Sequence, residues 1–161
     1  MFHQLEADVA IVGGGLAGLN TAIGAAEHGA RVVVMDKAKI ERSGASAGGV
    51  DHCLAYLDEG EPWDTREGYL EFVGRAARGA VDLRVHEAIF CDELTDALAR
   101  MARIGCPLHD PQTGRYYRTR SLGMPGAYWV NFDGKHLKPA LAREVRRLGC
   151  AVLDYVTATR L

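Results

Sequence analysis

Residues 7–36 read ADVAIVGGGLAGLNTAIGAAEHGARVVVMD, and this stretch decides the fold. The short apolar run Ala7–Val12 predicts a buried parallel strand. The Ala- and Leu-rich run Leu16–His28 predicts a helix. A second apolar run, Arg31–Met35, predicts another buried strand with Asp36 at its end. The order of strand, glycine turn, helix, strand and acid is typical of units that bind dinucleotides.

The glycines of the turn have the spacing G-x-G-x-x-G, at Gly13, Gly15 and Gly18. Gly13 permits a tight turn, Gly15 lets the backbone approach a pyrophosphate closely, and Gly18 lets the helix pack against the strand. The N–H groups of Leu16 and Ala17 have no acceptor within the helix. They suit a diphosphate, because the helix dipole places partial positive charge there.

The acid that follows the second strand limits the choice of dinucleotide. The carboxylate of Asp36 can accept hydrogen bonds from ribose hydroxyls. A carboxylate at this place disfavours a 2′-phosphate, so NADP fits less well than NAD or FAD. These residues leave the choice between NAD and FAD open.

The segment Ser43–Gly49, SGASAGG, consists almost entirely of small residues. One interpretation is a flexible loop. The other is a second close approach of the backbone to a flat cofactor, because small side chains permit contact and N–H groups and hydroxyls bind its oxygens. A long segment of this kind after the first strand–helix–strand unit favours the larger cofactor, FAD.

Composition sets the broad class of the protein. The chain has 161 residues, a net charge of −2 and 48% hydrophobic residues, which predicts one ordinary globular domain. It has no basic tail, so we expect no nucleic-acid partner. It has no apolar run of about 18 residues and no signal-peptide pattern, so we expect no membrane span and a cytoplasmic location. The four cysteines form no C-x-x-C pair, so we expect reduced thiols and no metal site.

The rest of the chain predicts helices, a hairpin and further strands. Asp64 is expected to cap a helix, and apolar spacing predicts one or two more helices up to Gly105. Later elements are expected as follows: a hairpin over Leu108–Arg120, a strand over Tyr128–Phe132, a helix over Lys138–Leu148 with Pro139 in its first turn, and a strand over Ala151–Tyr155 that continues to Leu161.

The hairpin carries three arginines, Arg115, Arg118 and Arg120. Alternate residues of a hairpin share one face, so these side chains could form a cluster that binds an anion. The other interpretation is a charged, solvated surface, and we favour it because exposed charges on hairpins are common.

The glycine fingerprint followed by R-S-G-A-x-A-G-G resembles the flavoprotein subunits of fumarate reductase and succinate dehydrogenase, and equally the α subunit of adenylylsulfate reductase. The resemblance implies an α/β fold, namely a Rossmann-like FAD-binding domain of the glutathione-reductase type. Such a domain has a parallel central sheet with inserted helices and a β-hairpin. The later order of G-x-P, hairpin, G-x-x-L, helix and strand agrees with this family.

The resemblance also implies which residues contact FAD. The pyrophosphate would lie on Gly13, Gly15, Gly18 and the amides of Leu16 and Ala17; the adenosine ribose on Asp36, with Lys37 beside it; the diphosphate and ribityl chain along Ser43, Gly44 and Ala45; the isoalloxazine near Gly48 and Gly49; and the adenine against the backbone near Val156.

One departure from the family bears on how FAD is attached. Membrane-bound members of the succinate dehydrogenase branch have a His after the Ser, and that His bonds covalently to FAD. This chain has Gly44 there, so we expect non-covalent FAD. The resemblance further implies a small anionic substrate in the full-length enzyme and an iron–sulfur electron-transfer subunit as a possible partner.

No catalytic residue can be assigned from the sequence. In the resembled families, the capping domain and the C-terminal part follow this region, so residues 1–161 are expected to be the N-terminal portion of an FAD-binding domain. Three alternatives stay open. The chain could belong to an adenylylsulfate reductase, it could be a nucleotide-binding module without turnover of its own, or it could be an NAD-binding dehydrogenase module.

Overall fold

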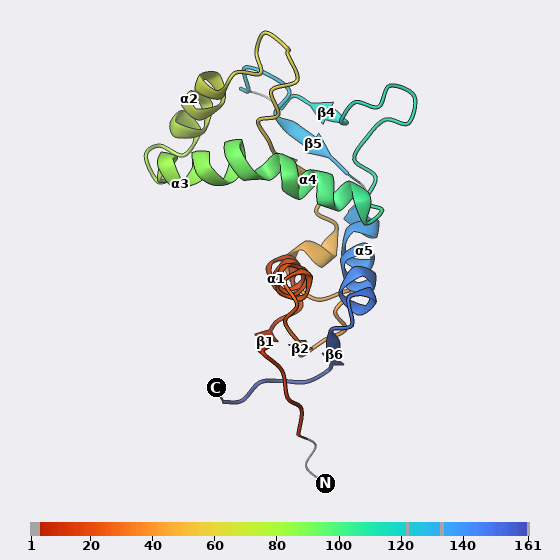
Figure 1. Cartoon of the computed structure of the whole chain (residues 1–161). Helices are drawn as coiled ribbons and strands as arrows, with labels where there is room; N and C mark the ends of the chain where they lie inside the picture. Colours follow the sequence, from red (N-terminus) through yellow and green to blue (C-terminus); the bar gives the residue numbers. More distant parts are fainter. Residues whose placement is uncertain (1–3, 122, 133, 161) are drawn as a thin grey trace. The chain divides into compact units, whose positions relative to one another are not determined.

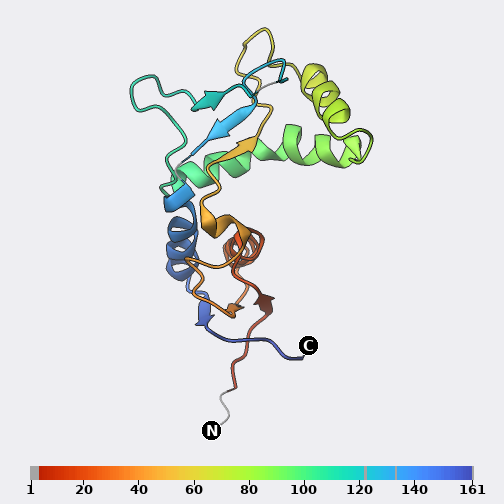
Figure 2. The ribbon, with the colours of Figure 1, turned by 180° about the vertical axis from the view of Figure 1, so that it is seen from behind.

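The computed structural model describes residues 4–121, 123–132 and 134–160. The chain forms two compact units (Figures 1 and 2). Unit 1 comprises Met1–Val50 and Gly134–Leu161, and unit 2 comprises Asp51–Asp133. The inserted helices and hairpin that the sequence predicts therefore make up a unit of their own.

Unit 1 contains a parallel sheet with the strand order β1-β2-β6. In the register of this sheet Val9 pairs with Val32, and Val33 pairs with Ala151. The elements of unit 1 are β1 (Val9–Val12), α1 (Leu16–Glu27), β2 (Val32–Asp36), the 3₁₀-helix η1 (Ala45–Gly48), α5 (Gly134–Arg147) and β6 (Ala151–Asp154). The predicted order of strand, glycine turn, helix, strand and acid is confirmed.

The core of unit 1 lies where α1 and α5 pack on the sheet. The two helices are side by side (red and blue in Figure 1). Leu19 and Ile23 of α1 and Leu141 and Val145 of α5 are fully buried, as is Val34 of β2. Each helix contributes residues four positions apart, which lie on one face of a helix, so both helices bury a continuous apolar stripe.

Strand β1 is less buried than the sequence predicts. Ile11 is buried, but the side chain of Val12 is 55% exposed. The reason is the strand order, because β1 is at one edge of a sheet that has three strands in the described part of the chain. An edge strand of a small sheet cannot be covered on all sides.

Helix α5 begins earlier than the sequence predicts. Its first residue is Gly134 rather than Lys138, so Pro139 lies inside the helix and not in its first turn. A Cβ atom at Gly134 would lie 2.0 Å from the carbonyl oxygen of Val50. The helix can therefore start here only because the residue is glycine.

Unit 2 contains an antiparallel sheet with the order β3-β5-β4. Its elements are β3 (His52–Leu54), α2 (Arg66–Ala76), α3 (Leu83–Glu87), the π-helical segment η2 (Ala88–Glu93), α4 (Leu94–Arg103), β4 (Arg118–Thr119) and β5 (Trp129–Asn131). The elements α3, η2 and α4 follow one another directly (green in Figure 1). The sequence does not predict a strand at β3, because three residues carry no periodic signal of their own.

Helix α2 is capped by Thr65 and not by Asp64. The Thr65 hydroxyl accepts the amide of Gly68 at 3.1 Å. Asp64 is buried and forms an ion pair of 2.6 Å with Arg118. The Arg118 guanidinium also lies 4.6 Å from the ring centre of Trp63. The interpretation of the hairpin arginines as a solvated surface is therefore wrong for Arg118, which is 8% exposed in its side chain.

The predicted hairpin is only partly regular. His109 and Tyr116 form an isolated bridge, and β4 pairs with β5 rather than with the first arm of the hairpin. Arg115 remains on the surface, where it pairs with Glu61 at 2.7 Å.

The chain after β6 does not continue as a strand, in contrast to the prediction. Tyr155 has a φ of 60°, a left-handed conformation that ends the strand. The next amide, of Val156, then donates to the carbonyl of Asp36 at 2.8 Å. Leu161 lies outside the described residues. None of the helices in the described part of the chain is long and apolar enough to cross a membrane.

Candidate functional site

A cavity of about 360 Å³ lies in unit 1 beside the carboxyl ends of β1 and β2. In open parallel sheets, ligands bind outside the carboxyl ends of the strands. The cavity is lined by Val12, Gly13, Gly15, Met35, Asp36, Lys37, Ala38, Ser43, Gly44, Val156, Thr157 and Ala158. The glycine turn, the acid after β2, the SGASAGG segment and the residues after β6 thus meet at one place.

The glycine turn has the geometry that a diphosphate site needs. Gly13 has a φ of 103°, and its amide donates to the carbonyl of Met35 at 2.8 Å. Gly15 is the N-cap of α1 and no side chain caps the helix there. The first amides of α1 therefore have no acceptor inside the helix. A Cβ at Gly18 would lie 1.9 Å from the carbonyl oxygen of Gly13, so the turn can close only on a glycine.

The SGASAGG segment meets the glycine turn directly. Gly44 has a φ of 82°, and a Cβ there would lie 2.8 Å from the Cα of Gly15. The hydroxyl of Ser43 donates to the carbonyl of Gly14 at 3.2 Å. Two glycines from separate segments therefore pack against each other, and the approach of this segment to a flat cofactor stays a prediction.

Asp36 organises the backbone around it. One carboxylate oxygen accepts the amide of Gly14 at 2.5 Å, and the other accepts the amide of Ala38 at 2.7 Å. Burial acts to raise the pKa of Asp36, but these two amides and the charge of Lys138 outweigh it, so the pKa is lowered. The carboxylate is therefore ionised and retains acceptor capacity for ribose hydroxyls.

Lys138 is a residue that the sequence analysis did not assign to the site. It is 1% exposed, and its ammonium donates to the carbonyl of Gly14. Burial lowers the pKa of Lys138, and the charges of Asp36 and Glu41 oppose this shift. The sequence pattern of α5 could have indicated its burial, because Lys138 is the one charged residue among the buried residues of this helix. The others are Gly134, Leu137, Ala140, Leu141, Ala142 and Val145.

The predicted contact residues fall into three groups. Seven line the cavity: Gly13, Gly15, Asp36, Lys37, Ser43, Gly44 and Val156. Leu16, Ala17 and Gly18 form the first turn of α1, immediately after the cavity-lining Gly15. Ala45, Gly48 and Gly49 do not line the cavity. Ala45 and Gly48 belong to η1, and Gly49 is its C-cap.

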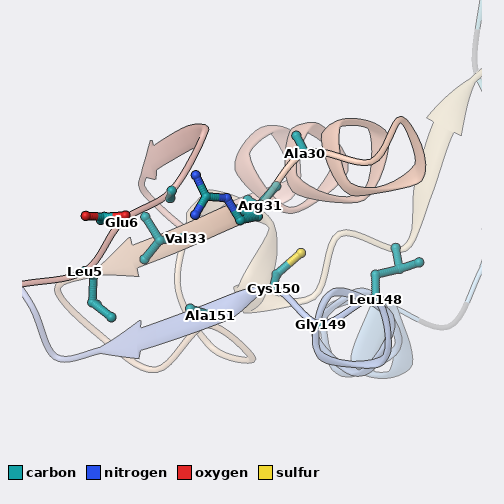
Figure 3. A pocket seen from close by; sticks show the side chains of 11 residues that line it. Leu5, Glu6, Ala30, Arg31, Val33, Leu148, Gly149, Cys150 and Ala151 are labelled. Atoms are coloured by element: carbon teal, nitrogen blue, oxygen red, sulfur yellow. The ribbon is translucent and has the colours of Figure 1, made fainter.

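A second cavity of unit 1 lies at the opposite, amino ends of β2 and β6 and has a volume of about 280 Å³ (Figure 3). Figure 3 shows Leu5 before β1, Arg31 at the start of β2 and Cys150 before β6 around it. Arg31 is already paired with Asp8 at 2.9 Å. This end of a parallel sheet is not where dinucleotides bind, so the first cavity is the candidate site.

The described residues contain no group of three His, Cys, Asp or Glu side chains that could hold a metal ion. All four cysteines are free. Burial raises the pKa of Cys53 and of Cys91 to about 11, so both are neutral thiols at physiological pH.

The residues around the first cavity fit a dinucleotide cofactor. The close contact of Gly15 and Gly44 leaves backbone rather than side chains at the cavity wall. The helix terminus offers amides and partial positive charge to a diphosphate. Asp36 offers a carboxylate to a ribose.

Solved structures with the same fold come from flavoproteins. Quinol fumarate reductase FrdA of E. coli, in a variant form, matches with a TM-score of 0.80 and 20% identity over 96% of this chain and 26% of that chain. The Sdh1 complex of Mycobacterium smegmatis matches with a TM-score of 0.78 and 19% identity, over 92% of this chain and 27% of that chain. Adenylylsulfate reductase of Archaeoglobus fulgidus matches with a TM-score of 0.67 and 24% identity, over 95% of this chain and 24% of that chain.

These likenesses confirm the expected fold. The chain spans about a quarter of the length of these solved proteins, at 24% to 27% of each. A comparison with curated protein sequences gives no match. Residues 8–161 match the sequence profile described as the FAD binding domain, and the chain therefore belongs to the FAD binding domain family, with FAD as its cofactor.

Proposed function

We propose that this chain is the FAD-holding part of a flavoprotein oxidoreductase of the fumarate reductase and succinate dehydrogenase type. The observation that carries the proposal is the meeting of Gly15 and Gly44 at the wall of one cavity, beside the carboxylate of Asp36. Bound FAD supplies hydride exchange with a substrate carbon. The chain's own residues bind and orient the cofactor.

Each part of the cavity has a role in this proposal. The turn Gly13–Gly18 holds the diphosphate, and Asp36, with Lys37 beside it, holds the adenosine ribose. Ser43, Gly44 and Ala45 follow the diphosphate and the ribityl chain. The fold likeness to FrdA and to Sdh1 supports this arrangement.

The remaining contacts in the proposal come from η1 and from the segment after β6. Gly48 and Gly49 are placed near the isoalloxazine. The backbone near Val156 is placed against the adenine. Its support is that Val156 lines the same cavity as Asp36 and donates to the Asp36 carbonyl at 2.8 Å.

The proposed attachment of FAD is non-covalent. The support is Gly44, which has no side chain that could form a bond to the flavin. The test is the visible absorption of the purified chain loaded with FAD, measured again after acid precipitation. Flavin colour in the supernatant supports the proposal, whereas colour that stays in the pellet contradicts it.

The proposed substrate of the complete enzyme is a small anion, with residues 1–161 as the N-terminal portion of a longer FAD-binding domain. The support for the small anion is the likeness to fumarate reductase FrdA. The support for a longer domain is that the chain spans about a quarter of the matched flavoproteins, at 24% to 27%. The test uses the full-length enzyme with reduced viologen as the electron donor. Oxidation of the viologen upon addition of fumarate supports the proposal, and no reaction with fumarate contradicts it.

A second candidate is an adenylylsulfate reductase. A specific observation favours it, since the identity to the Archaeoglobus enzyme is 24% against 20% for FrdA. The TM-scores favour fumarate reductase, at 0.80 against 0.67. Reduction of ferricyanide by the full-length enzyme with AMP and sulfite, and no reaction with succinate, would select the second candidate.

The proposed electron partner is an iron–sulfur subunit, which rests on the family resemblance of the sequence. The proposed compartment is the cytoplasm. Its support is that all four cysteines are free, as expected where thiols are kept reduced.

A further inference from the structure

Both backbone polar groups of Gly14, the amide and the carbonyl, form hydrogen bonds with side chains. Its amide donates to the carboxylate of Asp36 at 2.5 Å. Its carbonyl accepts both the ammonium of Lys138 and the hydroxyl of Ser43. A Cβ at Gly14 would lie 2.7 Å from a methyl carbon of Ile40, so the residue is enclosed on its remaining side as well.

The ammonium of Lys138 is not needed to satisfy the Gly14 carbonyl. The Ser43 hydroxyl already donates to that oxygen at 3.2 Å. Burial of a cation costs free energy, and here burial lowers the pKa of Lys138 against the pull of Asp36 and Glu41. A methionine of similar length would fill the same space without this desolvation cost, and the Asp36 carboxylate would keep the amides of Gly14 and Ala38. Folding alone therefore gives no reason for a lysine at this position.

The position of Lys138 points to the cofactor. Gly13 and Gly15, the neighbours of Gly14, both line the cavity, whereas Lys138 does not. Its charge therefore lies behind the turn, with the Gly14 peptide between the ammonium and the cavity. The charged groups that face it are Asp36, the last residue of β2, and Glu41 in the following loop, both acidic.

We propose that Lys138 is a positioning residue for the diphosphate of FAD. Its ammonium fixes the Gly14 carbonyl, so that the turn has its binding shape before the cofactor arrives. Its positive charge offsets part of the negative charge that the diphosphate brings to the turn. The proposal rests on FAD as the cofactor of this cavity and adds a residue that the G-x-G-x-x-G pattern does not include.

The test compares Lys138→Met with Arg143→Met, which removes an exposed cation from the same helix. Calorimetric titrations with FAD, ADP and adenosine measure affinity, and thermal unfolding of the apo chain measures stability. Amide hydrogen exchange at Gly14, followed by NMR in the apo chain, reports the shape of the turn without any ligand.

We expect Lys138→Met to weaken the binding of FAD and of ADP by tenfold or more. The affinity for adenosine, which has no diphosphate, should stay within twofold of wild type. The apo melting temperature should stay equal or rise, while exchange at Gly14 becomes faster. Arg143→Met should behave as wild type in each measurement.

Two results would overturn the inference. One is a Lys138→Met chain that binds FAD as tightly as wild type with unchanged exchange at Gly14. The other is a parallel loss of FAD, ADP and adenosine binding with a lowered melting temperature, which indicates a purely structural role. A wild-type chain that binds no FAD would instead contradict the cofactor assignment, and exchange at Gly14 would still decide whether Lys138 fixes the turn.

Discussion

The carboxylate of Asp36 accepts the amide of Gly14 at 2.5 Å, across 22 positions of sequence. The carboxylate of Asp36, the last residue of β2, therefore stabilises the glycine turn. Its other oxygen accepts a hydrogen bond from the amide of Ala38. With the ribose contact proposed for Asp36, this one side chain couples ribose recognition to the shape of the glycine turn.

This coupling predicts the effect of Asp36→Asn. An amide can present an oxygen to only one of the two N–H groups, and its own NH₂ then faces the other donor. Hydrogen bonds to a charged acceptor contribute about 1.5–3 kcal/mol each, so we expect about 2 kcal/mol lower stability and at least tenfold weaker FAD binding. Urea unfolding and FAD titration measure the two effects. Asp51→Asn, at an exposed acid, is the control.

The lowered pKa of Asp36 also predicts a dependence on acid. A carboxyl with a lowered folded pKa stabilises the native state above its ordinary pKa of 3.8, and this stability is lost as the pH falls through the lowered value. The stability advantage of wild type over Asp36→Asn should therefore shrink below pH 3.8. An advantage that persists unchanged into strong acid would contradict the ionised state of Asp36.

The buried lysine predicts a second pH dependence, of the same sign, at alkaline pH. The folded pKa of Lys138 lies below its ordinary value of 10.5, so in the window between the two the unfolded chain binds more protons. Wild type should gain stability relative to Lys138→Met as the pH rises through this window, with Asp36 and Glu41 charged throughout. Thermal unfolding of both chains over the alkaline range checks the sign.

The contact between Gly15 and Gly44 predicts a local effect of one methyl group. Gly44→Ala places a Cβ 2.8 Å from the Cα of Gly15 at a φ of 82°, so we expect a loss of about 2 kcal/mol together with weaker FAD binding. Gly48→Ala is the matched control for stability alone, because its Cβ meets open space in the same segment while Gly48 itself is proposed to lie near the isoalloxazine. Equal stability of the two variants would show that the close approach is not required.

In unit 2, the buried pair of Asp64 and Arg118 predicts a large effect on stability. Loss of one partner of a buried ion pair lowers the free energy of unfolding by about 3–5 kcal/mol. Glu59, at 3.1 Å from Arg118, remains as a partner, so we expect a loss of about 3 kcal/mol for Asp64→Ala. Glu61→Ala removes the exposed partner of Arg115 and should cost less than about 1 kcal/mol. Urea unfolding compares the two variants.

The sequence predicts those parts of unit 1 that depend on local signals. The glycine spacing and the two apolar runs lead to β1, α1 and β2, because each signal lies within the element that it specifies. The small residues of Ser43–Gly49 are also a local signal, since they predict contact between the backbone and a flat cofactor. The packing of Gly44 on Gly15 is a long-range contact that this pattern does not predict.

The missed features depend on residues far apart in the chain. Lys138 and Gly14 are 124 positions apart, and Arg118 and Asp64 are 54 apart. The local sequence pattern predicts Asp64 as a helix cap, but its side chain forms the long-range ion pair with Arg118 instead. Sequence patterns within one helix or hairpin cannot carry such information.

The most direct test of the account is a fluorescence titration of this chain with FAD and, separately, with NAD. We expect saturable quenching of flavin fluorescence by wild type, at least tenfold weaker FAD binding by Asp36→Asn, and NAD binding far weaker than that of FAD. NAD binding as tight as that of FAD, or no binding of FAD at all, would contradict the assignment of the cavity beside Gly13–Gly18 to FAD.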